Sequence, residues 1–359
     1  MSITQKDVLK ALSVVEDPDF KKDIVTLGMV KDVDIDGNIL KFTVQLTTPA
    51  CPLKEKIRQD CFDAINAAFD RQYVVEINMT ADVTSIRDKS QVLPNVKNII
   101  AIASGKGGVG KSTVTANLAL SLAESGAKVG VIDADIFGPS MPVMFKTESA
   151  KPGVVQIGEK NFIIPIEQYG VKILSIGYLA PSDNAVVWRG PMASTALKQF
   201  ITDTDWGNLD YLLIDLPPGT SDIHLTLVQT VPVTGAVIVT TPQKVALTDA
   251  QKGIDMFRQR QINVPILGLV ENMAYFTPEE LPNNKYYIFG KDGGKVLANR
   301  YEIPFLGEIP LVQSIREAGD EGQPIVMRND LTATIFKNIA QELARSIAIR
   351  NSTTVTASA

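Results

Sequence analysis

Cysteine and histidine are scarce in this chain. Its 359 residues include two cysteines, Cys51 and Cys61, and one histidine, His224. Two cysteines cannot build a disulfide framework, and such sparing use is typical of proteins in a reducing cytoplasm. One histidine likewise rules out a zinc centre built on several histidines. The sequence therefore predicts a cytoplasmic protein that is stabilised without disulfides.

Long apolar runs and an excess of positive charge are also missing. No stretch approaches the roughly 18 consecutive apolar residues that a membrane-spanning helix needs. The N-terminal stretch MSITQKDVLKALSVVEDPDF has early acidic residues and no apolar core followed by a cleavage site, unlike a signal peptide. The net charge is −5, whereas non-specific nucleic-acid binding relies on clustered Lys and Arg. We expect neither a membrane nor a nucleic acid as a partner.

The first part of the chain has a short α+β pattern. Residues 7–15 and 52–69 have the apolar spacing of helices, and Cys61 lies on the apolar face of the second. VKDVDIDGNILKFTVQL predicts a hairpin that turns at Asp36-Gly37-Asn38, and YVVEINMT predicts a further strand. A polar stretch that contains Pro94 follows. We therefore expect a small α+β domain over residues 1–88 and a linker over 89–97.

After the linker, apolar runs alternate with helical stretches. The runs are NIIAIAS, VGVID, VKILSIG, YLLIDL, GAVIVTT, ILGLVEN and FLGEIP. Strands that are apolar throughout are typical of a parallel sheet covered by helices on both faces. Residues 98–350 are therefore predicted to form a doubly wound, mostly parallel α/β domain, and the polar residues 351–359 a flexible tail.

The stretch SGKGGVGKST fits the phosphate-binding pattern G-x-x-x-x-G-K-[ST], with a predicted strand before it and a helix after it. Its glycines let backbone N–H groups surround phosphate oxygens at the positive end of the helix. Lys111 is expected on the β- and γ-phosphates, and Ser112 on Mg²⁺. The residues expected to bind the nucleotide here are Gly105, Lys106, Gly107, Gly108, Val109, Gly110, Lys111, Ser112 and Thr113.

Acidic residues end two of the predicted strands, where ligands bind in this architecture. Asp133 and Asp135 follow VGVI, and Asp215 follows YLLI. An aspartate after an apolar strand matches a Walker B position, so Asp215 is the expected second Mg²⁺ ligand. Aspartate is also a common helix cap, an alternative that applies most to Asp133.

KGGVGKST, DADIFGPSMP and DLPPGTSD together resemble the deviant Walker A ATPases, which include MinD, ParA and nitrogenase iron protein. Within that superfamily, GPSMP and DLPPGTSDIHLT resemble most the Mrp (ApbC) iron–sulfur cluster carriers. The resemblance runs from about residue 95 to 345, and the first ninety residues, with TTPACPLK, resemble the SufT-like domain.

The resemblance implies a role for each matched residue. Lys106 matches the signature lysine that reaches the phosphates of the other subunit in a dimer. Asp135 matches the switch I aspartate that positions the attacking water, and Asp215 the switch II aspartate near Mg²⁺. Asn272, after ILGLVE, matches an asparagine that contacts adenine. A second cation delivered late to the phosphates would also act like an arginine finger.

The chain departs from the family at the cluster site. Mrp-type carriers place a C-x-x-C pair after the ENM segment, and a dimer holds one 4Fe–4S cluster between two such pairs. Residues 271–294 contain no cysteine here, and Glu279 and Glu280 are expected in a solvated turn. Cys51 precedes Pro52, a plausible first helical residue, and a helix N-terminus would lower the pKa of its thiol. Cys51 is therefore a candidate cluster or metal ligand, with a buried or capping cysteine as the alternative.

The leading interpretation is a homodimeric, slow MgATPase that carries or assembles iron–sulfur clusters for apoproteins or with assembly factors. A MinD- or ParA-like positioning ATPase is one alternative. It would need a membrane-targeting helix, but LTATIFKNIAQELARSIAIR has the spacing of a core-docking face. A nucleotide-switched scaffold that no longer binds a cluster is the other alternative.

Overall fold

The computed structural model describes residues 3–87, 92–136, 138–178, 190–220, 222–278, 280–281, 283–328 and 330–358. By its internal contacts the chain divides into two units. Unit 1 comprises Met1–Thr84 with Ile347–Ala359, and unit 2 comprises Ser85–Ser346. Each unit buries a hydrophobic core of its own.

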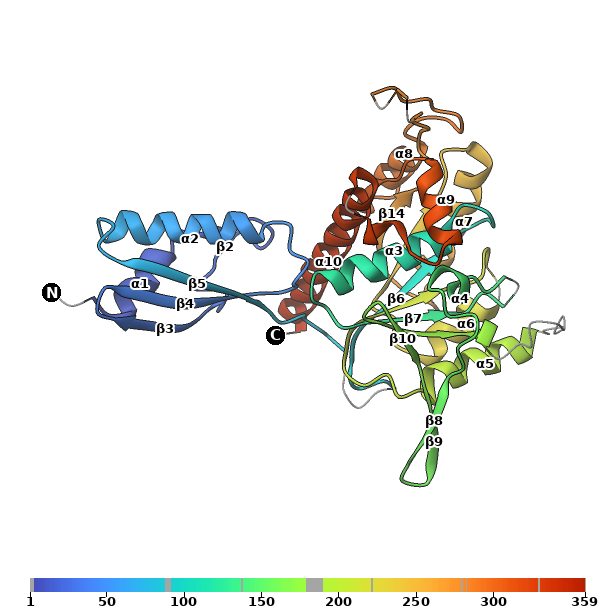
Figure 1. The fold of residues 1–359 in the computed structure, drawn as a ribbon, viewed down its shortest axis with the longest axis horizontal. Helices are drawn as coiled ribbons and strands as arrows, with labels where there is room; N and C mark the ends of the chain where they lie inside the picture. Colours follow the sequence, from blue (N-terminus) through green and yellow to red (C-terminus); the bar gives the residue numbers. More distant parts are fainter. Residues whose placement is uncertain are drawn as a thin grey trace. The chain divides into compact units, whose positions relative to one another are not determined.

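Unit 1 is a three-stranded sheet with two helices on one face (Figure 1). Its main elements are α1 (Gln5–Leu12), β3 (Val30–Asp36), β4 (Ile39–Leu46), α2 (Lys54–Ala68) and β5 (Val74–Ala81), with β1 (Glu16–Asp17) and β2 (Lys22–Asp23) as a small separate pair. The predicted hairpin is confirmed, because β3 and β4 pair antiparallel across a turn where Gly37 has a φ of 59°. β5 pairs parallel with β4.

Helix α1 begins earlier than the apolar spacing predicted. Thr4 accepts a hydrogen bond from the Asp7 backbone N–H, and the Asp7 side chain accepts one from the Thr4 N–H. This reciprocal capping fixes the start of a helix, so α1 begins at Gln5.

Unit 2 is built on an eight-stranded sheet in the order β10-β11-β7-β12-β6-β13-β14-β15. The strands are β6 (Val96–Ala103), β7 (Val129–Asp133), β10 (Ile166–Gln168), β11 (Val171–Ser175), β12 (Leu209–Asp215), β13 (Gly235–Thr240), β14 (Ile266–Glu271) and β15 (Phe305–Glu308). All neighbouring pairs are parallel except β10 with β11. Every residue of β7 and β13 is buried, which requires cover on both faces. The predicted doubly wound fold is confirmed.

Helices surround this sheet and connect its strands (Figure 1). They are α3 (Lys111–Glu124), α4 (Met141–Met144), η1 (Ile176–Tyr178), α5 (Gly190–Thr202), α6 (Asp222–Thr230), α7 (Lys244–Arg258), α8 (Gly293–Arg300), α9 (Gln313–Asp320), η2 (Ile325–Met327) and α10 (Leu331–Ser358). The order of the central strands brings the carboxyl ends of β6, β7 and β12 to one edge of the sheet.

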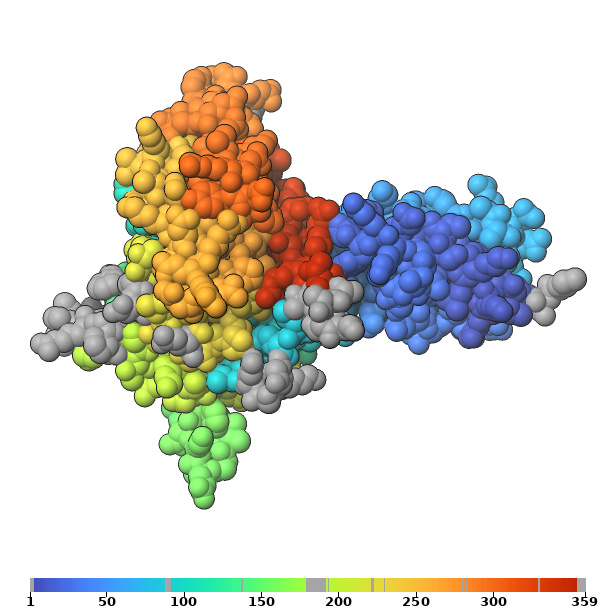
Figure 2. All heavy atoms as spheres, turned by 180° about the vertical axis from the view of Figure 1, so that it is seen from behind, coloured from blue at the N-terminus to red at the C-terminus, as the bar shows by residue number. Residues whose placement is uncertain are grey.

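Two features of the fold were not predicted from the sequence. A hairpin of β8 (Gly153–Ile157) and β9 (Lys160–Ile164) forms its own two-stranded sheet and projects from the body of unit 2 (Figure 2). Residues 351–358, expected as a flexible tail, instead continue α10. This segment contains no glycine or proline to end the helix, and the buried Asn351 amide donates to the Thr84 carbonyl at 2.9 Å.

Candidate functional site

The glycine-rich loop joins the end of β6 to the start of α3. Gly108 and Gly110 both have a φ of 80°, in the left-handed region that glycine adopts without strain. A Cβ on Gly105 would overlap the backbone carbonyl of Asp249 in α7, and one on Gly110 would overlap the Asn272 side chain. The loop therefore needs glycine both for its backbone angles and for its close approach to neighbouring segments.

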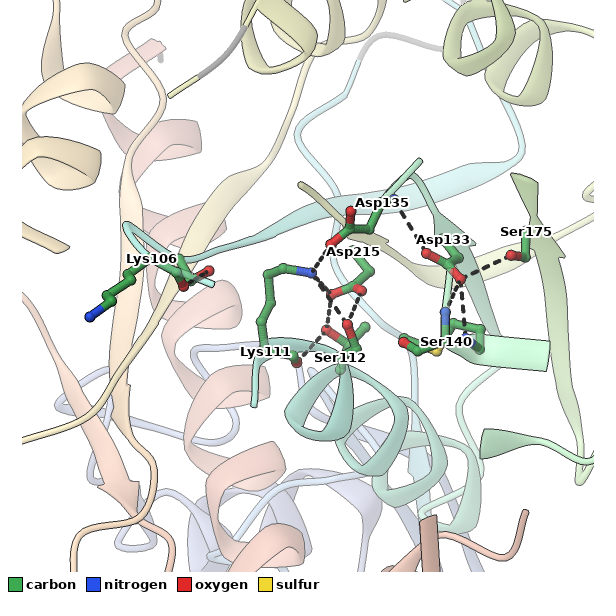
Figure 3. Close-up of polar contacts among 11 residues, drawn as sticks. Lys106, Lys111, Ser112, Asp133, Asp135, Ser140, Ser175 and Asp215 are labelled. Atoms are coloured by element: carbon green, nitrogen blue, oxygen red, sulfur yellow. Dashed lines mark hydrogen bonds and ion pairs between the residues drawn. The ribbon is translucent and has the colours of Figure 1, made fainter. Parts of the chain in front are cut away.

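Lys111 and Asp215 form a buried ion pair at the start of α3 (Figure 3). Lys111 Nζ lies 2.9 Å from Asp215 Oδ1, and the side chains are 6% and 0% exposed. Asp135 Oδ2 lies 3.9 Å from the same Nζ. The structure thus brings together three residues that the sequence placed in separate motifs.

Two hydroxyl groups of α3 complete the surroundings of Asp215. Ser112 Oγ donates to Asp215 Oδ2 at 2.6 Å, and Thr115 Oγ1 donates to Asp215 Oδ1 at 2.8 Å. Hydroxyl and carboxylate oxygens are the ligands that Mg²⁺ prefers, so Ser112 and Asp215 fit the expected metal. Sequence reasoning missed Thr115, although its position four residues after Lys111 places both on one face of a helix.

Asp133 lies beside Asp215 on the neighbouring strand and is fully buried. Its Oδ2 accepts hydrogen bonds from the backbone N–H groups of Ser140 and Met141, each at 3.1 Å, and from Ser175 Oγ at 2.9 Å. Burial and the nearby Asp215 carboxylate raise the pKa of Asp133 to about 7. The participation of Ser175 was not predicted, because nothing in the local sequence marks it.

Lys106 lies apart from this cluster. Its side chain is exposed and points away from Lys111 and Asp215 (Figure 3). Only its backbone joins the local network, where its carbonyl accepts a hydrogen bond from Ser104 Oγ at 3.0 Å. Within one chain, therefore, the two lysines of the loop face different surroundings.

Asn272 lies where the chain leaves β14 and is 6% exposed. Its Nδ2 donates to the Val109 carbonyl of the glycine-rich loop at 2.8 Å. It also lines a pocket of about 490 Å³ that extends from Gly110 and Thr113 to Pro310 and Leu311. The walls of this pocket are mainly apolar, and it opens beside the phosphate-binding loop.

The two cysteines both lie in unit 1. Cys61 is fully buried in α2, as predicted, and burial raises the pKa of its thiol to about 12. Cys51 is half-buried. α2 begins at Lys54 with Leu53 as its N-cap, so Pro52 is not the first helical residue that the sequence suggested. The Cys51 carbonyl accepts a bond from the Lys54 N–H in a turn before the helix, so Cys51 lies two residues before the N-cap.

The segment that lacks the expected cysteine pair carries aromatic residues. Phe276 and Tyr286 face each other in a short antiparallel bridge, and Lys285 Nζ lies 3.8 Å from the Tyr275 ring centroid. Glu280 is exposed as expected, whereas Glu279 lies outside the described residues. Across the described part of the chain, no group of three or more His, Cys, Asp or Glu side chains could hold a metal ion.

His224, in α6, is buried and packs its ring edge-on to Phe257 at a centroid distance of 6.3 Å. Such packing agrees with a structural role for this histidine. Within the described residues, no helix combines the length and the hydropathy that crossing a bilayer requires.

Two family models match the chain. The model described as ParA, NUBPL iron-transfer P-loop NTPase, matches residues 95–344, and the model described as iron-sulfur cluster assembly protein matches residues 5–79. An iron-sulfur cluster carrier protein from Synechocystis sp. is 45% identical over 97% of this chain and 99% of its own length. One from Deinococcus radiodurans is 45% identical over 96% of this chain and 95% of its own length.

A solved structure resembles the nucleotide-binding part. It is a nucleotide-binding protein from Archaeoglobus fulgidus in complex with ADP, with cobalt found in it. It is 39% identical, has a TM-score of 0.58, and covers 68% of this chain and 93% of its own.

Proposed function

The chain belongs to the family of NUBPL iron-transfer P-loop NTPases, and from this premise we propose that it is a homodimeric MgATPase that carries iron–sulfur clusters to apoproteins. The cluster of Lys111, Ser112 and Asp215, in which Lys111 and Asp215 are buried, is the observation that carries the proposal. The Lys111 cation, the Ser112 hydroxyl and the Asp215 carboxylate beside a glycine-rich loop at a helix start support phosphate and Mg²⁺ binding here.

Bound ATP would replace Asp215 as the partner of the Lys111 ammonium group. The triphosphate offers Lys111 several charged oxygens, and Ser112 and Asp215 would then hold Mg²⁺ with the oxygens that now bond each other. Bound Mg²⁺ neutralises charge on the phosphate oxygens. Because Lys111 and Asp215 are almost fully buried, these interactions occur away from bulk water, where they are strong.

Asp135 and Lys106 take the catalytic roles in this proposal. Asp135 lies at the edge of the cluster, 3.9 Å from Lys111 Nζ, and would orient the water that attacks the γ-phosphate. The exposed Lys106 side chain points away from its own site, as a lysine that serves the phosphates of a second subunit should. Each subunit would then complete the other's site.

Asn272 would contact the adenine of the bound nucleotide. Its Nδ2 is held by the Val109 carbonyl, so the amide is already oriented, and the adjoining pocket of about 490 Å³ has apolar walls for a planar base. The bond to Val109 also ties the base pocket to the loop that holds the phosphates.

The cluster would travel as cargo. Unit 2 contains no cysteine, and soft iron in a cluster favours thiolate ligands, so the described nucleotide-binding unit does not fit a 4Fe–4S cluster by itself. Cys61 is buried with a raised pKa, which leaves Cys51 as the cluster ligand that we propose. A dimer would supply two Cys51 thiolates, and thiols from a partner or a small molecule would complete the set.

Anaerobic reconstitution with ferrous iron and sulfide tests the cargo. We expect wild-type protein and the control Cys61→Ala to bind iron and sulfide, and Cys51→Ser to lose most of both. Equal contents in Cys51→Ser and wild type would remove Cys51 from the proposal. If the wild-type protein hydrolyses ATP but binds no iron in this reconstitution, the second function, a nucleotide-switched scaffold, is favoured. The lack of cysteine in unit 2 supports this second function.

A MinD-like membrane role finds less support. The apolar face of α10 includes Ile339 and Leu343, which are buried and not available to a bilayer. Co-sedimentation with anionic lipid vesicles, with and without ATP, tests this alternative. We expect the protein to stay in the supernatant in both cases.

A further inference from the structure

One buried carboxylate connects three segments around the phosphate site (Figure 3). Asp133 Oδ2 accepts bonds from the first N–H groups of α4 and from Ser175 at the end of β11. Its other oxygen, Oδ1, accepts a bond from the Asp135 backbone N–H at 3.3 Å. The Asp135 backbone and the start of α4 therefore share a single anchor.

Helix α4 has no cap of its own. Ser140 occupies the N-cap position, where a serine hydroxyl often accepts a bond from the first turn, but its side chain makes no such bond. Ser140 Oγ is buried and has no hydrogen-bond partner among the described residues. Asp133, at the end of β7, instead accepts hydrogen bonds from the Ser140 and Met141 N–H groups at the start of α4.

Ser175 extends the anchor to a third segment. Its hydroxyl donates to Asp133 and accepts a bond from the Gly177 N–H at 3.0 Å. A Cβ on Gly177 would crowd Ser175, Pro139 and Pro142, so η1 packs closely against the chain that leads into α4. The carboxylate thereby fixes the end of β7, the start of α4 and the start of η1 together.

We propose that Asp133 is a positioning residue for the ATPase site, which holds Asp135 and α4 in place relative to the phosphate loop. This role rests on the proposed hydrolysis of ATP at that loop. The hydrogen bonds of Asp133 go to the segment that carries Asp135 and leads into α4, and to Ser175. Removal of the carboxylate should therefore impair the orientation of Asp135 more than the binding of nucleotide.

Asp133→Asn tests the role with little change in volume. The amide keeps one acceptor oxygen but presents N–H groups where the carboxylate accepted bonds, so it cannot satisfy all four donors. We expect kcat for ATP to fall by about 10- to 100-fold, as for a misplaced catalytic group, while the Kd for MgADP measured by calorimetry stays unchanged. Ser175→Ala, which removes one of the four hydrogen bonds to Asp133, should change kcat in the same direction by less.

Hydrogen exchange at residues 138–145 gives a readout that does not need hydrolysis. Asp133→Asn should speed exchange at the Ser140 and Met141 amides, whereas the control Ser140→Ala should leave exchange unchanged because its hydroxyl makes no hydrogen bond. Unchanged exchange in Asp133→Asn would overturn the proposal. The proposal would also be overturned if kcat fell only in proportion to the fraction of protein that still binds MgADP. That pattern would indicate a role in folding alone.

The same experiments separate the two hypotheses. If wild-type protein binds nucleotide but does not hydrolyse it, the proposed ATPase function fails. The exchange comparison then still decides whether Asp133 anchors α4. If Asp133→Asn does not fold, both kcat and hydrogen exchange at residues 138–145 are measured on Ser175→Ala.

Discussion

Lys106 and Lys111 are two residues of one type, five positions apart in the sequence, that lie in different surroundings. Lys111 is buried, and its charge is paired with Asp215 of the same chain. Lys106 is exposed and points outward. In a buried pair, loss of one partner leaves the other uncompensated, at a cost of about 3–5 kcal/mol, whereas loss of an exposed lysine costs little stability. Substitution of Lys106 therefore tests its proposed catalytic role without a large loss of stability.

Lys106→Ala should lower the turnover of ATP by about 10³-fold or more, as for loss of an arginine finger, while nucleotide binding and the melting temperature persist. Steady-state hydrolysis and calorimetric titration with MgADP measure the two effects. Lys160→Ala, at an exposed position on β9, is a matched control and should keep wild-type turnover. Unchanged turnover in Lys106→Ala would exclude the proposed role.

The cysteines offer a second prediction at the residue scale. Cys61 is fully buried and its pKa is raised to about 12, so almost no thiolate exists at neutral pH. Cys51 is half-buried in a turn. Brief treatment of native protein with iodoacetamide at pH 8 should therefore modify Cys51 and spare Cys61, whereas both should react in urea. Peptide mass spectrometry measures the two sites, and native labelling of Cys61 would contradict the assignment of that residue to the core.

At the scale of elements, the sequence predicted the buried strands well because parallel strands covered on both faces are apolar throughout. It also predicted the glycine-rich loop and its flanking strand and helix. It could not predict contacts between distant segments, such as Thr115 with Asp215 or Ser175 with Asp133, because these depend on strand order. The hairpin β8–β9 escaped prediction because its strands are short and partly exposed, with apolar residues on both faces.

The contact between the glycine-rich loop and α7 provides a test at this scale. Gly105→Ala should destabilise unit 2 by more than about 2 kcal/mol and weaken nucleotide binding, because its Cβ would overlap the Asp249 backbone. Gly253→Ala, in the same helix α7, meets nothing within 4 Å and should stabilise the protein by about 0.5–1 kcal/mol. Urea unfolding measures both free energies. The same sign for the two substitutions would contradict the close contact at Gly105.

Among the described residues, each of the two units has a hydrophobic core. The phosphate loop, its acidic partners and the pocket beside Asn272 all lie in unit 2, whereas both cysteines lie in unit 1. Nucleotide binding should therefore stabilise one unit directly and the other only through any coupling between them.

Differential scanning calorimetry should resolve this difference. At a nucleotide concentration of about 100 times Kd, binding adds about 2.7 kcal/mol to the stability of the unit that binds it. For a unit of this size, that increment raises the melting temperature by roughly 5–10 °C. We expect MgADP to shift the transition of unit 2 by this amount and to leave that of unit 1 nearly unchanged. A single transition that shifts as a whole would show that the two units unfold together.

The hairpin β8–β9 also has a practical consequence. Gly158 and Glu159 form its exposed turn, and the hairpin meets the segment around Thr204 only at its other end, through Ile163, as far as the described residues show. Exposed turns tolerate insertions because few contacts depend on them. A small fluorescent tag inserted between these residues would give each chain an optical label remote from the phosphate loop. Energy transfer between donor- and acceptor-labelled chains would then measure the proposed association of subunits as ATP is added.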